Sequence, residues 1–74
     1  MSIDMSHKAQ RLFGENVKQF RKKAGLSQEE LAAQIDRDPR SIVAIESGNR
    51  NPTFSTIFKL CQALKVKSSQ LLPF

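Results

Sequence analysis

Residues 27–48, SQEELAAQIDRDPRSIVAIESG, read as a short helix, a tight turn and a second short helix. Ser27 is a favourable N-cap, and a glutamate three residues later completes a capping box. Asp38 is a second N-cap, followed by Pro39 at the first helical position, where a missing N–H costs nothing. Gly48 then predicts a left-handed stop. Such short helices are not stable alone in water, so the rest of the chain must hold them.

The second helix of this stretch has two unlike faces. At about 100° per residue, Ile42 and Ile45 point inward, and so does Glu46. The outward face is small, apolar and basic, and comprises Arg40, Ala44 and Ser47, with Val43 on its flank and Arg37 in the turn before it. A solvated face would carry mixed charges, whereas a face that enters a DNA major groove needs little bulk, an arginine and an apolar contact for thymine. The pattern favours DNA binding over an ordinary solvated surface.

Length and composition predict one small domain, 1–74, with a disordered arm at 1–5. Lys plus Arg is 12 against 7 for Asp plus Glu, which gives a net charge of +5 and favours a polyanionic partner. The single cysteine allows no disulfide within the chain. There is no run of ~18 apolar residues for a membrane span, and MSIDMSH does not resemble a signal peptide. These features predict a cytoplasmic location.

The remaining segments also read as helices. Apolar residues at 13, 17, 20 and 24 predict a helix over 7–24, with Ser6 as its N-cap. Thr53 is the next N-cap, and an apolar stripe predicts a helix over 54–64. Ser68 can cap a last short turn over 69–72. The sequence therefore predicts an all-α fold of five helical segments, without a strand candidate.

Residues that could support other chemistry lack partners in the sequence. One histidine, His7, and one cysteine, Cys61, cannot form a tetrahedral zinc site. Cys61 lies on the core face of the fourth helix, which favours a buried structural thiol over a redox sensor. No catalytic triad, carboxylate pair or glycine-rich phosphate loop is recognisable. We expect no enzyme activity, no metal and no cofactor.

Two long segments resemble the lambda-repressor-like family of helix-turn-helix regulators, also called the xenobiotic-response-element or Cro-type family. They are FRKKAGLSQEELAAQI at 20–35 and SIVAIESGNRNPTFSTIFKLCQAL at 41–64, followed by LL at 71–72. The resemblance covers roughly 12–72, nearly the whole chain. It implies a compact five-helix bundle that binds operator DNA, usually as a two-fold dimer on a palindromic site.

The resemblance also implies roles for individual positions. Bases would be read by Arg37, Asp38, Pro39, Arg40, Val43 and Ala44. Phosphates would be contacted by Ser27, Gln28, Ser47, Arg50, Asn51 and Thr53. Arg21 and Glu46 match a structural ion pair that joins the first helix to the recognition helix. This agrees with the inward position of Glu46, and we expect the pair to be partly buried.

The chain departs from the family pattern at four positions. Asp36 and Lys65 stand where relatives often have glycine, so each would have to adopt a left-handed backbone, at a cost of up to ~1 kcal/mol. Pro39 and Ala44 stand where relatives often carry hydrogen-bonding side chains. We therefore expect Arg37 and Arg40 to make the base contacts, with apolar contacts from the helix to thymine methyl groups.

The C-terminal part holds more apolar residues than five short helices readily bury: Phe54, Phe58, Val66, Leu71, Leu72 and Phe74. Two interpretations stay open: these residues complete a small core, or they form a dimer patch. The resemblance favours a dimer, with Val66, Leu71 and Phe74 at its interface.

We therefore expect a sequence-specific regulator that binds a palindromic DNA operator as a homodimer, with the helix 39–47 in the major groove. An autoregulated repressor or a restriction-modification controller would fit. Two alternatives stay open: an antitoxin-like subunit that also binds a toxin protein, and an adaptor that uses the same fold to bind proteins. The operator sequence and the sign of regulation do not follow from the residues.

Overall fold

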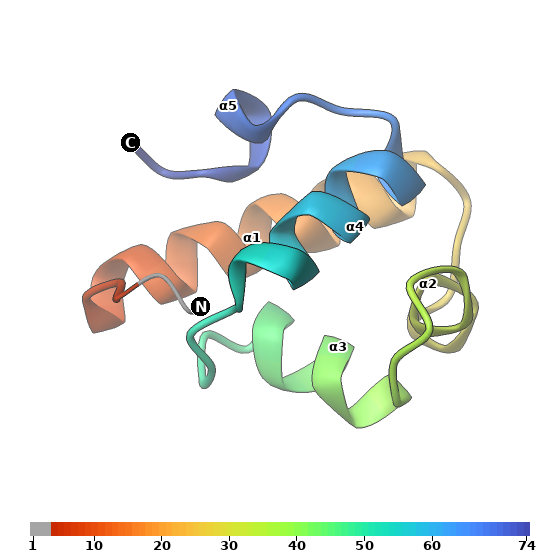
Figure 1. Cartoon of the computed structure of the whole chain (residues 1–74), viewed down its shortest axis with the longest axis horizontal. Coiled ribbons are helices and arrows are strands. Elements are labelled where there is room, and N and C mark those ends of the chain that lie inside the picture. Colours follow the sequence, from red (N-terminus) through yellow and green to blue (C-terminus); the bar gives the residue numbers. More distant parts are fainter. Residues whose placement is uncertain (1–3) are drawn as a thin grey trace.

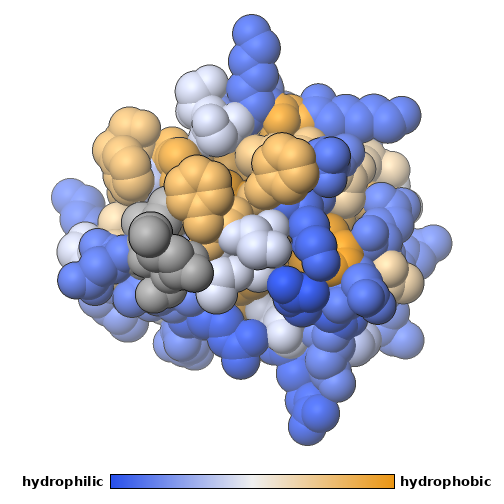
Figure 2. Space-filling model, viewed as in Figure 1, coloured by the Kyte–Doolittle hydropathy of each residue, from blue (hydrophilic) through white to orange (hydrophobic). Residues whose placement is uncertain are grey.

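The computed structural model describes residues 4–74, and within them it has five helices. These are α1 (His7–Lys23), α2 (Gln28–Gln34), α3 (Pro39–Glu46), α4 (Phe54–Leu64) and α5 (Ser68–Leu71). α1 runs through the middle of the molecule, with α2 and α3 on one side and α5 on the other (Figure 1). Most of the surface in this view is hydrophilic, and apolar side chains gather near α4 and α5 (Figure 2). The predicted five-helix, all-α fold is confirmed for the described residues.

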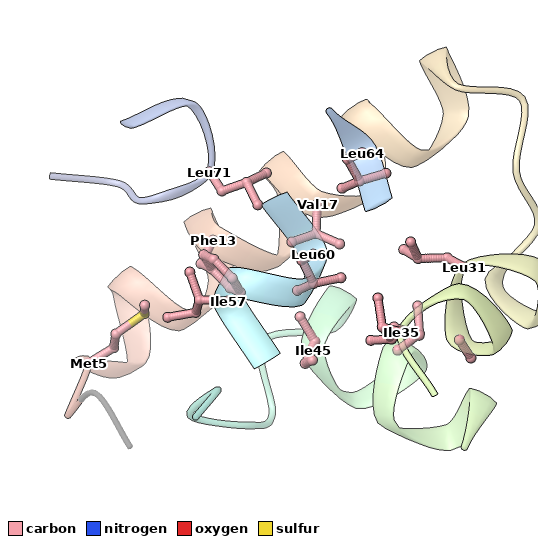
Figure 3. Packing of buried hydrophobic residues seen from close by; sticks show 12 residues of the cluster. Met5, Phe13, Val17, Leu31, Ile35, Ile45, Ile57, Leu60, Leu64 and Leu71 are labelled. Carbon is pink, nitrogen blue, oxygen red and sulfur yellow. The ribbon is translucent and has the colours of Figure 1, made fainter. Parts of the chain in front are cut away.

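Every helix contributes to one core, which holds the two short helices in place (Figure 3). α3 packs against both α1 and α2, while α5 packs against α1 and α4. The fully buried side chains come from all five helices and include Phe13, Val17, Leu31, Ile42, Ile45, Leu60 and Leu71. Because this core is shared, the position of α3 depends on packing contributed by distant parts of the chain.

The predicted capping signals define four helix starts. The Ser27 hydroxyl accepts from the Glu30 N–H at 3.0 Å while the Glu30 carboxylate accepts from the Ser27 N–H at 2.8 Å, which completes the capping box. Ser6 and Thr53 cap α1 and α4 in the same way, and Asp38 caps α3. The start of α5 differs from the prediction: Lys67, not Ser68, precedes the helix. The predicted last turn was therefore displaced by one residue.

Tight turns use left-handed residues where the sequence indicated them. Gly48 follows α3 with φ of 78°. Asp36 and Lys65 have φ of 56° and 57°, so the two non-glycine departures from the family pattern do adopt the left-handed backbone. Asp36 lies between α2 and α3, and its conformation allows the sharp turn of the helix-turn-helix unit.

Two predictions about the chain ends are wrong. Met5 is not part of a disordered arm: its side chain is buried, and its N–H donates to the Asn51 side-chain oxygen at 2.9 Å. The expected arm otherwise falls mainly on 1–3, which lie outside the described residues. Leu71 is fully buried in the core, so it is not exposed for a dimer interface.

Candidate nucleic-acid interface

The inner side of α3 packs against α1 and α2, and its outer side forms one continuous surface. Ile42 and Ile45 are buried between α1 and α2, as the helical spacing predicted. On the outer face the Arg40 side chain is 90% exposed and Val43 is 47% exposed. Ser47 is exposed at the C-terminal end, and Ala44 is half-buried. The outer face therefore combines a long basic side chain with small and apolar groups, which suits entry into a DNA groove.

Asp38 and Arg40 form a two-bond ion pair at the start of α3. Arg40 Nε donates to Asp38 Oδ1 and Nη2 donates to Oδ2, both at 3.1 Å. Asp38 Oδ1 also accepts the backbone N–H of Arg40 at 2.8 Å, which is the N-cap bond of the helix. The side-chain and backbone donors of Arg40 lower the pKa of Asp38 from 3.8 to about 2. Two of the six predicted base-reading residues are thus joined to each other.

The shifted pKa of Asp38 gives a testable titration. Because the folded pKa lies below the ordinary value of 3.8, the carboxylate and its pair persist above that pH and are lost as pH falls through about 2. We expect a ¹³C NMR titration of the Asp38 carboxyl group, read on the folded protein, to have its midpoint near 2. In Arg40→Ala the midpoint should rise toward 3.8. An unchanged midpoint in this variant would show that Arg40 does not pair with the carboxylate in solution.

A second ion pair lies inside the molecule and joins α1 to α3. Arg21 Nε donates to Glu46 Oε2 at 2.7 Å, Nη2 donates to Oε1 at 3.1 Å, and Nη1 donates to the Leu26 carbonyl at 2.8 Å. The side chains are only 10% and 4% exposed. The bonds to Glu46 raise the pKa of Arg21. The pair implied by the family resemblance is present, and it is more deeply buried than predicted.

Gln28 belongs to the same network. Its side-chain amide donates to Glu46 Oε1 at 3.1 Å, while its backbone begins α2 next to the Ser27 cap. The amide carries two N–H bonds, so one stays available for a ligand at the surface. The predicted phosphate-contacting glutamine is thereby oriented by the recognition helix itself.

The loop between α3 and α4 contributes a basic hollow of about 190 Å³. It is lined by polar and basic side chains from the loop, from α3, from the turn before it and from the start of α4: Arg37, Ser41, Arg50, Asn51, Thr53 and Thr56. Arg50 Nη1 donates to the Ser41 hydroxyl at 3.0 Å. Arg37, predicted to read bases, therefore lies with the predicted phosphate contacts. The side-chain oxygen of Asn51 already accepts the backbone N–H of Met5, so the side-chain N–H₂ group of Asn51 is left for a ligand.

Sequence reasoning missed two residues that position this surface. Ser41 was not selected, although it anchors Arg50. Gly14 was also missed, although its Cα lies against the end of α3: a Cβ there would stand 2.2 Å from the Ile45 carbonyl oxygen. A glycine in the middle of a long helix was the available signal, because glycine is unfavourable there unless another backbone approaches closely.

An apolar patch lies near α4, α5 and the C-terminus (Figure 2). Phe54, Phe58 and Phe74 are 62%, 58% and 78% exposed, and Val66 is half-buried. A hollow of about 310 Å³ between α4 and α5 is lined by Phe54, Ile57, Phe58, Cys61, Ser68 and Leu72. We call the three exposed phenylalanines and Val66 the aromatic patch: Phe54, Phe58, Val66 and Phe74. An exposed aromatic group of this size on a small domain indicates a contact surface.

Cys61 is half-buried at the patch, and burial raises the pKa of its thiol, which disfavours the reactive thiolate. Residues 4–74 contain no cluster of three or more metal-ligating side chains. None of the helices described is long and apolar enough to cross a membrane.

Comparison with known proteins gives consistent matches over most of the chain. The control protein C.BamHI of Bacillus amyloliquefaciens is 39% identical over 71 residues, which covers 95% of this chain and 88% of the relative. A helix-turn-helix-type transcriptional regulator of Sinorhizobium fredii is 37% identical over 62 residues, covering 84% of this chain and 80% of the relative.

Solved structures agree with these relatives. The restriction-modification controller protein C.AhdI of Aeromonas hydrophila superposes with a TM-score of 0.82 at 33% identity, covering 85% of this chain and 96% of that one. Hydroxypropylphosphonic acid epoxidase also superposes, with a TM-score of 0.85, but at 22% identity and over 36% of its length, so that likeness concerns the fold alone. The helix-turn-helix family HTH_3 matches residues 17–71. The chain therefore belongs to this family of lambda-repressor-like, DNA-binding transcriptional regulators.

Proposed function

We propose that the chain binds a palindromic DNA operator as a homodimer and regulates transcription from it, with residues 39–47 of each copy in the major groove. The observation that carries this proposal is the outer face of α3. Ile42 and Ile45 anchor the helix in the core, and Arg40 and Val43 are exposed on its opposite side. The only acid on this face, Asp38, is paired with Arg40. A fixed, slender and basic helix face is what groove entry requires.

The contacts divide between bases and backbone. We assign base reading to the outer face of α3 and its N-cap, namely Asp38, Pro39, Arg40, Val43 and Ala44. We place Arg37 with the backbone contacts because it lines the basic hollow. Phosphate contacts fall to Ser27, Gln28, Ser47, Arg50, Asn51 and Thr53. The hollow between Arg37 and Arg50 offers two guanidinium groups and three hydroxyl groups, which are suitable donors for a phosphate.

Homodimerisation is supported by the aromatic patch. The patch lies near α4, α5 and the C-terminus, while α3 is on the opposite side of α1, so a contact there leaves the recognition helix uncovered (Figure 1). A self-complementary patch would pair two copies about a two-fold axis, as a palindromic site requires. Of the interface residues expected from sequence, Val66 and Phe74 stay in this proposal, and Phe54 and Phe58 join them.

A charge placed in the patch should separate the copies. We expect Phe58→Glu to weaken dimerisation on the order of 30-fold or more, because a buried aromatic anchor is replaced by a charge that must be desolvated. Sedimentation equilibrium over a concentration series measures the shift to monomer. Gln34→Glu introduces the same charge at the exposed end of α2, away from the patch, and should leave the dimer intact. An unchanged dimer in Phe58→Glu, with its fold intact by circular dichroism, would place the interface elsewhere.

The relatives suggest the regulatory context. C.BamHI is described as a control protein and C.AhdI as a restriction-modification controller protein. We propose a similar role here, in which the protein regulates a linked restriction-modification locus, and the dimer equilibrium makes operator occupancy depend on protein concentration. Such a regulator acts on the chromosome and therefore in the cytoplasm.

Selection of genomic DNA fragments by the purified protein, at two salt concentrations, tests the proposal. We expect recovery of a palindromic motif, with an affinity that falls steeply as salt rises because phosphate contacts release counterions. Salt-dependent binding without a motif would show that the protein binds DNA electrostatically and without sequence specificity, which contradicts the proposal. Absence of binding at either salt would refute the proposal and favour a protein partner, such as a toxin, for this fold.

A further inference from the structure

We propose that Asp38 is a positioning residue that holds the Arg40 guanidinium in one orientation, so that its outer edge reads the guanine of a G·C pair. This inference rests on the DNA-binding function proposed above. It concerns how the recognition helix converts one arginine into a base-specific contact. Two of the N–H donors of Arg40 bind Asp38, and its other donors are free to bind a base.

The carboxylate occupies one edge of the guanidinium. Nε and Nη2 donate to the two Asp38 oxygens, both at 3.1 Å. An arginine has five N–H donors in a rigid planar fork. The two bonds therefore leave the Nη1 group and the second N–H of Nη2, and among residues 4–74 no acceptor is recorded for them. One N–H of Nη1 and the free N–H of Nη2 are parallel and form a second fork, on the edge of the guanidinium next to the edge that Asp38 occupies.

The carboxylate is itself fixed to the helix. Asp38 Oδ1 accepts the backbone N–H of Arg40 at 2.8 Å as the N-cap bond. Pro39, between the two residues, has a fixed φ and no N–H that could compete for the carboxylate. The chain of contacts thus runs from the helix backbone to Asp38 and from Asp38 to the guanidinium plane. The pair is exposed and contributes little to stability, so its effect is to favour one orientation of a long side chain.

Guanine suits the donor edge that remains. In the major groove it presents the acceptors O6 and N7 side by side, and a planar fork of two N–H groups binds both. Adenine offers a donor beside N7, so it cannot accept the second bond. A lysine-like point charge would not make this distinction, since it can bind any acceptor or phosphate.

The negative charge of Asp38 adds to the discrimination. It partly cancels the charge of Arg40 and repels phosphate groups. Arg40 therefore adds less electrostatic affinity for phosphates than an unpaired arginine would. A contact that relies on two directed hydrogen bonds is retained, and it strengthens once water is excluded from the groove. Asp38 should therefore lower affinity for non-operator DNA while raising the preference for guanine at one position.

Duplexes carrying the selected motif, with each G·C pair replaced in turn by A·T, test the inference. We expect the wild type to lose affinity on the order of 10-fold or more at one G·C position of each half-site, and to lose a similar amount when that guanine is 7-deazaguanine. Arg40→Ala should abolish this position-specific loss. Asp38→Asn, which keeps the cap because asparagine also caps helices, should remove most of the discrimination and bind non-operator DNA more tightly.

Asp36→Asn is the matched control, because it makes the same charge change in the exposed turn without touching Arg40. It should keep the guanine preference. If Asp38→Asn is folded and discriminates as well as the wild type, the inference is wrong while the proposed function stands. If the wild type selects no motif at all, the proposed function itself fails, and the inference with it.

Discussion

Glu46→Ala is expected to destabilise the folded chain by about 3–5 kcal/mol, because it leaves the Arg21 guanidinium buried without its counter-charge. Arg21 gives two of its three hydrogen bonds to this carboxylate, and its side chain is 10% exposed. A chain of this length has a total stability of roughly 4–11 kcal/mol. The loss is a large share of that total, so the denaturation midpoint of the variant should fall steeply. Gln28 also loses its hydrogen-bond partner in this variant.

Urea denaturation followed by circular dichroism measures the loss. Glu29→Ala is the matched control: the residue is an exposed glutamate on α2, so its removal should change stability by less than about 0.5 kcal/mol. The double variant Arg21→Met/Glu46→Leu should recover most of the stability, since apolar groups of similar size often replace a buried pair without loss. A Glu46→Ala protein with a wild-type denaturation midpoint would show that water reaches Arg21.

The Arg21–Glu46 pair is an example of a feature of the site that could be predicted from sequence. Helical spacing placed Glu46 on the inner side of a helix with two buried isoleucines, and a buried carboxylate needs a partner. Capping residues such as Ser27 and Thr53 act on donors three positions away, so their effect is encoded locally and can be recognised without a structure. The starts of the four helices with such a cap, α1 to α4, were predicted correctly for this reason, whereas the start of α5 was not.

Contacts between distant segments could not be predicted in the same way. Met5 is buried because its backbone meets Asn51, 46 positions away, and no local pattern encodes that meeting. Leu71 and Phe74 are both apolar and near the C-terminus, yet one is fully buried and the other is 78% exposed. Leu71 is the last residue of α5, which packs against α1 and α4, whereas Phe74 lies beyond the helix. Arg37 lies in the basic hollow because the α3–α4 loop folds back toward it.

Gly14 is the strongest case of a contact that depends on this long-range packing. It lies in the middle of α1, where glycine costs about 1 kcal/mol relative to alanine. An added Cβ would stand 2.2 Å from the Ile45 carbonyl oxygen and 2.9 Å from that of Glu46. Both atoms are backbone atoms of α3, so relief would require the whole recognition helix to move. The absence of a side chain is thus what allows α1 and α3 to pack this closely.

We expect Gly14→Ala to lower the free energy of unfolding by about 3 kcal/mol, the upper part of the usual range for overpacking, despite the better helix propensity of alanine. Operator affinity should also fall at temperatures where the variant is folded, because α3 is displaced relative to Gln28 and the α3–α4 loop. Thermal denaturation and binding titrations measure the two effects. Gly25→Ala is the control: it meets no atom within 4 Å and suffers only the strain of its positive φ, roughly 1 kcal/mol. If Gly14→Ala were instead more stable than the wild type, helix propensity would outweigh packing at this site. The close approach of α1 to α3 would then not be what fixes the recognition helix.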